Sequence, residues 1–200
     1  EEIIKKEPSA RIVLSGWRRL VFVGVGSRLV KLYLKQNREN REKTKLLGEL
    51  GERLAVAQLV RNGFRNVENL NQVRLNHEFA DLLAERGGER FVISVKTRRK
   101  WQRLGGLNAK YNLGKNWRDH SNHVAEKFQA IPAWIAIQID GPKFSMYFGT
   151  IRLIEESNGI PMEPEALEYY ECLVSDGLHG YDEDSITPDY KVVVGGNLDS

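Results

Sequence analysis

The stretch from Phe79 to Thr97 reads FADLLAERGGERFVISVKT and decides the fold that we expect. Apolar and β-branched residues fill both halves of this stretch, which predicts one strand over Glu78–Ala84 and a second over Phe91–Thr97. Gly87-Gly88 lies between them and is a signal for a tight hairpin turn. The sequence therefore predicts a β-hairpin at the centre of a sheet.

Polar residues with chemical potential lie on both strands of this hairpin. Asp81 is on the first strand and Lys96 on the second, so the turn brings them to one end of the sheet. Because side chains alternate along a strand, Ser94 and Lys96 share a face and Val95 points the other way. A carboxylate can hold Mg²⁺ through oxygen, and a lysine can orient or deprotonate a water. Such a site would polarise a phosphodiester and stabilise the charge that develops on cleavage.

The clearest helix signal runs from Leu46 to Asn62, and Gly63 is placed to end that helix. Apolar residues recur there at helical spacing and form the expected buried face: Leu47, Leu50, Leu54, Ala57 and Val60. Upstream, Arg11–Lys35 fits a strand pair or an amphipathic helix, and Gln36–Lys45 fits a connector or an exposed helix start.

After the hairpin, three further elements are expected in the chain. They are a helix over Asp119–Ala130, a buried strand over Ala133–Asp140 and its hairpin partner over Lys143–Ile151. The order helix, hairpin, strand, helix, strand, strand predicts an α/β fold with a mixed central sheet flanked by helices.

The quoted hairpin resembles that of the PD-(D/E)xK nucleases. Upstream, the helix sequence GELGERLA at 48–55, followed by Leu59 and Gly63-Phe64, resembles the helix that opens the archaeal Holliday-junction resolvases and related small bacterial proteins. The resemblance covers about Leu46 to Arg98. It implies a restriction-endonuclease-like α/β core, and Glu52 matches the family's helix glutamate, which helps to organise the metal site.

The resemblance implies an enzyme, a Mg²⁺-dependent (or Mn²⁺-dependent) endonuclease that hydrolyses DNA phosphodiester bonds and selects DNA by its structure. The implied catalytic residues are Asp81, Lys96, Glu52 and Ser94. Asp81, Glu52 and the backbone carbonyl of Val95 would hold the cation. DNA is the implied partner, and a homodimer is compatible with the resemblance.

Ser94 is a departure, because the family has its second carboxylate at this position and serine brings no negative charge. Three interpretations stay open. The Val95 carbonyl suffices together with Asp81 and Glu52; or another carboxylate, Glu78 or Glu49, takes over the role. In the third, the site is silent and the protein is a nucleic-acid-binding or partner-docking module on the same fold.

The charge distribution also favours a polyanionic partner. Residues 1–110 contain 24 Lys/Arg against 12 Asp/Glu, and residues 111–200 contain 6 against 15. No acid occurs between Ser94 and Arg118, where cations alternate with Trp101, Tyr111 and Trp117. Cations contact phosphates and exposed rings stack on bases, so the residues expected to bind nucleic acid are Arg98, Arg99, Lys100, Trp101, Arg103, Lys110 and Lys115.

Three alternatives to this interpretation of the charges stay open. The charge blocks can be a solubility surface, and the stretch after Ser94 can be a solvated loop whose aromatic rings pack into the core. The acidic segment 155–200 can instead be the docking surface of a protein–protein adaptor.

Composition sets further expectations. The single cysteine, Cys172, excludes an intramolecular disulfide and a cysteine-built metal centre, and it fits a reducing compartment such as the cytoplasm. The apolar run Leu20–Val25 is too short to span a bilayer, so no membrane partner is expected. We expect a basic extension over 1–45, the nuclease-like core over 46–154, and an acidic segment over 155–200 that packs on the core or extends it.

Overall fold

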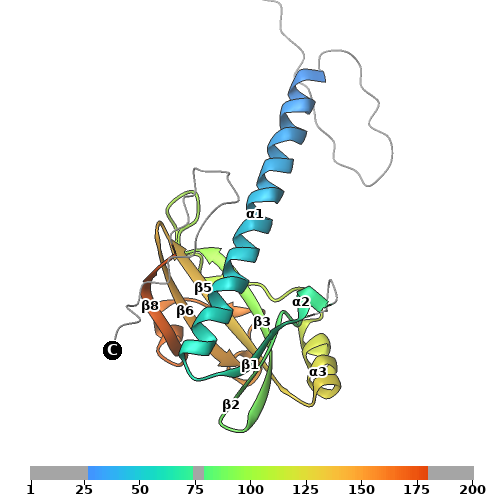
Figure 1. Ribbon diagram of the computed structural model, residues 1–200. Coiled ribbons are helices and arrows are strands. Elements are labelled where there is room, and N and C mark those ends of the chain that lie inside the picture. Colours follow the sequence, from blue (N-terminus) through green and yellow to red (C-terminus); the bar gives the residue numbers. More distant parts are fainter. Residues whose placement is uncertain (1–26, 74–78, 180–200) are drawn as a thin grey trace, which may run out of the picture. The chain divides into compact units, whose positions relative to one another are not determined.

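The protein is described here by a computed structural model that defines residues 27–73 and 79–179. The chain divides into two compact units, Glu1–Asn40 and Arg41–Ser200, and every described strand lies in the second unit (Figure 1). The segments 1–26 and 180–200, and with them most of the expected 1–45 extension and the end of the acidic segment, lie outside the described residues.

A six-stranded sheet forms the centre of the second unit, in the order β1-β2-β3-β5-β6-β8. Only β3 and β5 pair in parallel, and the other four neighbouring pairs of this sheet are antiparallel. The expected α/β fold with a mixed central sheet flanked by helices is therefore confirmed. The strands are β1 (Arg65–Asn69), β2 (Leu82–Arg86), β3 (Glu89–Arg99), β5 (Ile131–Asp140), β6 (Lys143–Thr150) and β8 (Glu171–Leu178).

Helix α1 runs from Ser27 to Arg61, so the expected start at Leu46 was wrong. Neither glycine nor proline occurs from Ser27 up to Gly48, and most residues there are good helix formers. The helix therefore continues through the polar stretch 36–45. It ends as expected: Gly63 has φ +79°, and the N–H of Phe64 donates to the carbonyl of Leu59 at 3.0 Å.

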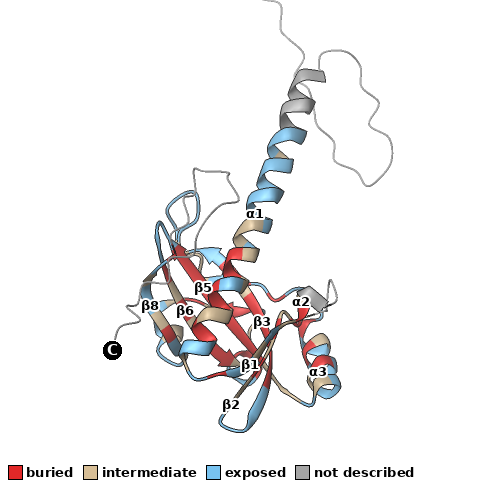
Figure 2. Cartoon of the chain, viewed as in Figure 1, coloured by how far each residue is buried: buried red, intermediate tan, exposed pale blue. Residues whose placement is uncertain are grey.

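Leu50 and Leu54 of α1 are buried as expected, and they pack in the main hydrophobic core with Ala55 and Leu59. Figure 2 shows buried residues on the C-terminal part of α1 and on the central strands. Val60, expected on the same face, is 57% exposed. Leu59 follows Leu54 by five positions, so the buried stripe shifts around the helix axis and leaves Val60 outside it.

The main core lies between α1 and one face of the sheet. Phe64, Phe91 and Phe148 meet there edge to face, with ring centroids 5.3 to 5.9 Å apart. The guanidinium of Arg86 lies 4.1 Å from the Phe64 ring centroid and makes a bidentate pair with Glu171. Arg86 thereby links β2 to β8, which is distant in the strand order.

The opposite face of the sheet packs against α3 (Trp117–Phe128) and short elements. The segment Arg98–Arg118, for which a solvated loop was one alternative, contains the end of β3, a hairpin, a short strand and the start of α3. Tyr111 and Trp117 are buried in a second core cluster, so they cannot serve as exposed stacking rings. The short elements are α2 (Leu70–Val73), β4 (Lys110–Tyr111), a 3-10 helix (Ile151–Ile154), β7 (Ile160–Pro161) and α4 (Pro164–Leu167).

Strand β8 comes from the acidic segment 155–200. It pairs with β6 and forms one edge of the central sheet, so part of this segment extends the core. Of the helices in the described chain, none is both long enough and apolar enough to cross a membrane.

Candidate active site

Asp81 stands immediately before β2, and not within the expected strand Glu78–Ala84. Phe79 has φ +69°, which breaks the extended backbone, and strand pairing with β3 begins at Leu82. The backbone of Asp81 is fixed at both ends: its N–H donates to the Ile93 carbonyl at 2.9 Å, and its carbonyl accepts from the Leu70 N–H at 3.0 Å. The carboxylate is therefore anchored beside the part of β3 that β2 does not cover.

The carboxylate of Asp81 is directed at three consecutive residues of β3. Its Oδ2 accepts the Val95 N–H at 2.7 Å and the Ser94 hydroxyl at 3.4 Å. The Lys96 Nζ lies 3.9 Å from the same oxygen, and both side chains are about four-fifths buried. Ser94 and Lys96 thus face Asp81 as expected, while Val95 packs in the main core.

Glu52 reaches this cluster from α1 through two asparagines. Asn69 Nδ2 donates to Glu52 Oε2 at 2.9 Å, and Asn71 Nδ2 donates to Glu52 Oε1 at 3.1 Å. The same Asn71 nitrogen lies 3.3 Å from Asp81 Oδ1. One amide nitrogen therefore contacts both carboxylates, which places Glu52 and Asp81 on either side of a single small group.

The asparagines have a clear electrostatic role. An ionised carboxylate only accepts hydrogen bonds, so the amide nitrogen is the end that faces it. Asn69 is itself positioned, because its Oδ1 accepts the Asn71 N–H at 2.9 Å. The two amides hold the carboxylates close together, where their like charges would otherwise repel.

The donor set fits a hard divalent cation. Mg²⁺ prefers oxygen ligands, keeps several waters, and is held in proteins by one or two carboxylates together with substrate phosphate oxygens. Glu52 and Asp81 supply two such carboxylates. No group of three or more His, Cys, Asp or Glu gathers within residues 27–73 and 79–179. Further oxygens would have to come from the backbone, water and the substrate.

The predicted site residues Glu52, Asp81, Ser94, Val95 and Lys96 are brought together. Asn69 and Asn71 were not predicted from the sequence. The signal was weak: two amides spaced two apart after a strand are more often turn residues. Of the two substitute carboxylates, Glu49 pairs with Lys45 at 3.6 Å, and Glu78 lies outside the described residues.

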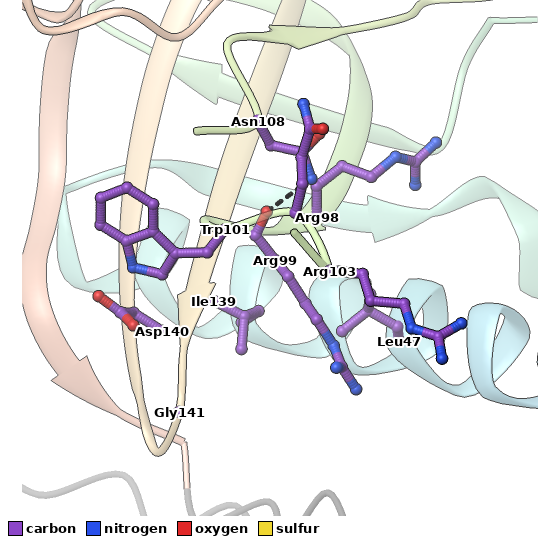
Figure 3. A pocket seen from close by; sticks show the side chains of 10 residues that line it. Leu47, Arg98, Arg99, Trp101, Arg103, Asn108, Ile139, Asp140 and Gly141 are labelled. Carbon is purple, nitrogen blue, oxygen red and sulfur yellow. Dashed lines mark hydrogen bonds between the residues drawn. The ribbon is translucent and has the colours of Figure 1, made fainter. Parts of the chain in front are cut away.

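Four of the residues expected to bind nucleic acid line one pocket beside this site: Arg98, Arg99, Trp101 and Arg103 (Figure 3). Lys100 is adjacent and pairs with Asp140 at 3.7 Å. Lys110 and Lys115 are exposed but do not line the pocket. Neither Glu52 nor Asp81 lines it, so it is separate from the carboxylate cluster.

The chain is similar to the crystal structure of Hjc, a Holliday junction resolvase from Archaeoglobus fulgidus, with a TM-score of 0.48 and 17% identity. The match covers 63% of this chain and 96% of that chain. No family model matches the chain, and no curated protein does.

Proposed function

We propose that this protein is a metal-dependent nuclease that hydrolyses phosphodiester bonds in DNA. One observation carries the proposal: the carboxylates of Glu52 and Asp81 share the Asn71 amide, and Lys96 Nζ stands 3.9 Å from Asp81. Two acids and a lysine from three separate elements converge on one partly buried spot. The neighbouring cationic pocket supplies the means to hold a phosphate backbone.

In this proposal each residue has a distinct task. Glu52 and Asp81 would hold Mg²⁺ or Mn²⁺, together with oxygens from the Val95 carbonyl, water and a substrate phosphate. The cation, when bound, would polarise the phosphodiester and offset the charge of the transition state. Lys96 would orient the attacking water and stabilise developing negative charge. Ser94 and the Val95 N–H would hold the Asp81 carboxylate in place.

The second candidate is a catalytically silent DNA-binding module. Asp81 Oδ2 already has three partners, the Val95 N–H, the Ser94 hydroxyl and Lys96. Ser94 is fully buried and supplies no charge where the resemblance predicts an acid. The cluster can therefore be a structural link between α1 and β3 that needs no metal ion, and the protein's function is then to bind DNA.

A cleavage assay separates the two candidates. The purified protein is incubated with linear, single-stranded, flap and four-way DNA in Mg²⁺, in Mn²⁺ and in EDTA. Metal-dependent cleavage that is lost in Asp81→Asn and in Lys96→Met is the expected result. Truncating groups that act as one catalytic unit costs several orders of magnitude in rate, so each single variant should lose nearly all activity.

The control is Glu49→Gln, one turn before Glu52 on α1, which removes a carboxylate that pairs with Lys45 outside the cluster. It should cleave like the wild type, while Glu52→Gln should not. Salt-sensitive DNA binding without cleavage in either metal would establish the silent module. Absence of both cleavage and binding at low salt would refute both candidates.

A further inference from the structure

The pocket beside the carboxylate cluster is built by the ends of β3 and β5, the following hairpin and Leu47 of α1. Its volume is about 560 Å³, which lies in the range of small-ligand pockets. Figure 3 shows Trp101 and Asp140 on one side, Arg99 and Arg103 on the side toward Leu47, and Ile139 between them. The pocket thus has a cationic side, an apolar floor and an aromatic side.

The cationic side fits a phosphate. Three arginines line the pocket, and a guanidinium presents a planar fork that binds phosphate oxygens in pairs. Among the described residues that line the pocket, Asp140 is the one with an acidic side chain. The Nζ of Lys100 lies 3.7 Å from Asp140 Oδ2. Because Lys100 offsets this acid, the arginines give the pocket a net positive charge.

The aromatic side fits a nucleobase. Trp101 is 48% exposed, whereas Trp117 and Trp134 are buried, so Trp101 presents ring surface to solvent. The Nζ of Lys100 lies 5.4 Å from the Trp101 ring centroid. A flat base can stack on such a ring whatever its identity, because every base has a π-face.

The wall that carries Trp101 is ordered by its own backbone. The Gln102 N–H donates to the Gly106 carbonyl at 2.7 Å, and the Asn108 N–H donates to the Lys100 carbonyl at 2.8 Å. The Asn108 side chain also donates to the Arg99 carbonyl at 2.9 Å (Figure 3). These bonds form a closed hairpin from Lys100 to Asn108, so the pocket is preformed and a ligand need not order it.

The position of the pocket relates it to the proposed nuclease site. Arg98, which lines the pocket, follows Lys96 by two residues on β3, so both side chains leave the same face of the sheet, about 7 Å apart at the usual rise of a strand. Arg99 leaves the opposite face, toward Leu47 of α1. A DNA strand held at Lys96 can therefore pass Arg98 at the end of β3 and place a nucleotide a few steps away in the pocket, provided that its base is unpaired and free to leave the stack.

We propose that this pocket binds one unpaired nucleotide of a DNA strand, with its phosphate on Arg99 and Arg103 and its base against Trp101. The inference rests on the proposed function and gives it a substrate class. The preferred DNA has a single-stranded segment within a few nucleotides of the bond that is cleaved, as at an overhang, a flap or a gap.

Binding measured in EDTA tests the pocket without any need for cleavage. The probes are a blunt duplex, the same duplex with a single-stranded overhang, and free dAMP, each titrated with the full chain. The wild type should bind the overhang DNA more tightly than the blunt duplex. Trp101→Ala should reduce affinity for the overhang DNA roughly 5- to 150-fold and leave the blunt duplex unchanged, whereas Trp101→Phe should restore it.

Matched variants separate the pocket from general charge. Arg103→Ala and Arg65→Ala each remove one exposed arginine, but Arg65 lies on β1 opposite Glu85, near the start of β3 and far from the pocket. Only Arg103→Ala should lower the ratio of overhang to duplex affinity, by about tenfold. Leu104→Ala alters the 97%-exposed tip of the same hairpin without touching the pocket and should have no effect on this ratio.

Three results would overturn the assignment. Equal affinity for blunt and overhang DNA in the wild type would show that the pocket selects no unpaired nucleotide. Unchanged binding of the overhang DNA by Trp101→Ala would show that the base does not bind against Trp101 in the pocket. Binding of dAMP as tight as that of the overhang DNA would make this a site for free nucleotides. Because no metal is present, failure of cleavage does not affect these outcomes.

Discussion

Gly51 allows α1 to approach β3 closely enough for the next residue, Glu52, to reach the site. A Cβ built at Gly51 would lie 1.7 Å from Thr97 Oγ1 and 2.8 Å from Thr97 Cβ, both far inside normal contact. One turn earlier, a Cβ at Gly48 would meet nothing within 4 Å. The two glycines therefore form a matched pair for the substitution glycine to alanine.

The expected energies have opposite signs. Alanine is favoured over glycine in a helix interior by about 1 kcal/mol, so Gly48→Ala should stabilise the fold by up to that amount. Gly51→Ala gains the same term but forces Thr97 or α1 to move, and overpacking of this kind costs about 1–3 kcal/mol. Since the overlap is severe, we expect the upper end of that range and a net loss of about 2 kcal/mol.

Thermal unfolding followed by far-UV circular dichroism measures the difference. For a chain of this length, 1 kcal/mol corresponds to a change in Tm of about 2–4 °C. Gly51→Ala should lower Tm by about 4–8 °C, and Gly48→Ala should raise it by up to about 4 °C. Gly51→Ala should also reduce DNA cleavage, because the displaced helix carries Glu52 away from Asn71.

A second variant tests the cause. Thr97→Ala removes the hydroxyl, which is buried without a hydrogen-bond partner within the described chain, and it leaves a Cβ-to-Cβ overlap of 2.8 Å with Ala at position 51. The double variant should therefore recover part of the loss, with a coupling energy of at least about 0.5 kcal/mol. If Gly51→Ala stabilises the protein as Gly48→Ala does, then α1 does not contact β3 in this way, and the placement of Glu52 is wrong.

Three further predictions follow from single contacts. Asn71→Asp places a third carboxylate between Glu52 and Asp81, so the free energy of unfolding in EDTA should fall by about 1.5–3 kcal/mol. Mg²⁺ should restore it, which Tm measured with and without the cation will show. A Tm equal to that of the wild type in EDTA would contradict the described cluster. Arg86→Ala should lower the free energy of unfolding by about 1–2 kcal/mol, because it removes the bidentate ion pair with Glu171 and the cation–π contact with Phe64. Arg90→Ala removes only the exposed ion pair with Glu85 and should lower it by less than about 1 kcal/mol, as denaturant unfolding of both variants will show. Burial raises the pKa of Tyr170 from 10.0 to about 12, so the unfolded chain loses this proton at lower pH than the folded protein, and stability should fall as the pH rises from 10 to 12. In a series of chemical denaturation curves, Tyr170→Phe should make this fall less steep. An unaltered pH dependence would mean that Tyr170 is not buried against Trp134.

The hairpin and the main core could be predicted because their sequence patterns are local and strong. Two apolar strands around Gly87-Gly88 and the alternation of Ser94, Val95 and Lys96 fix a register in which one face is buried. The same patterns predicted the wrong first residue for helix α1 and for strand β2. Helix propensity carries α1 back to Ser27 through the polar stretch 36–45, and Phe79 ends the strand that Asp81 was expected to share.

The asparagines and the pocket could not be predicted, because both depend on contacts between elements distant in sequence. Asn71 matters only because α1 brings Glu52 to it, 19 residues away. Likewise, no local signal distinguishes Trp101 from Tyr111 in the same basic stretch. The first lies on an exposed hairpin, and the second is buried by β7 and its neighbours.

The serine at position 94 changes the charge balance of the proposed site in a way that bears on its substrate. Glu52 and Asp81 bring two negative charges and Lys96 one positive charge, so the cluster is one charge less negative than it would be with an acid at 94. A divalent cation would leave it with one net positive charge, which the single negative charge of a phosphodiester cancels. Cation and DNA should therefore bind cooperatively, each raising the affinity of the other by the same factor. Ser94 therefore lowers the negative charge that attracts Mg²⁺ to the free protein, so we expect a weak affinity for Mg²⁺ in the absence of DNA.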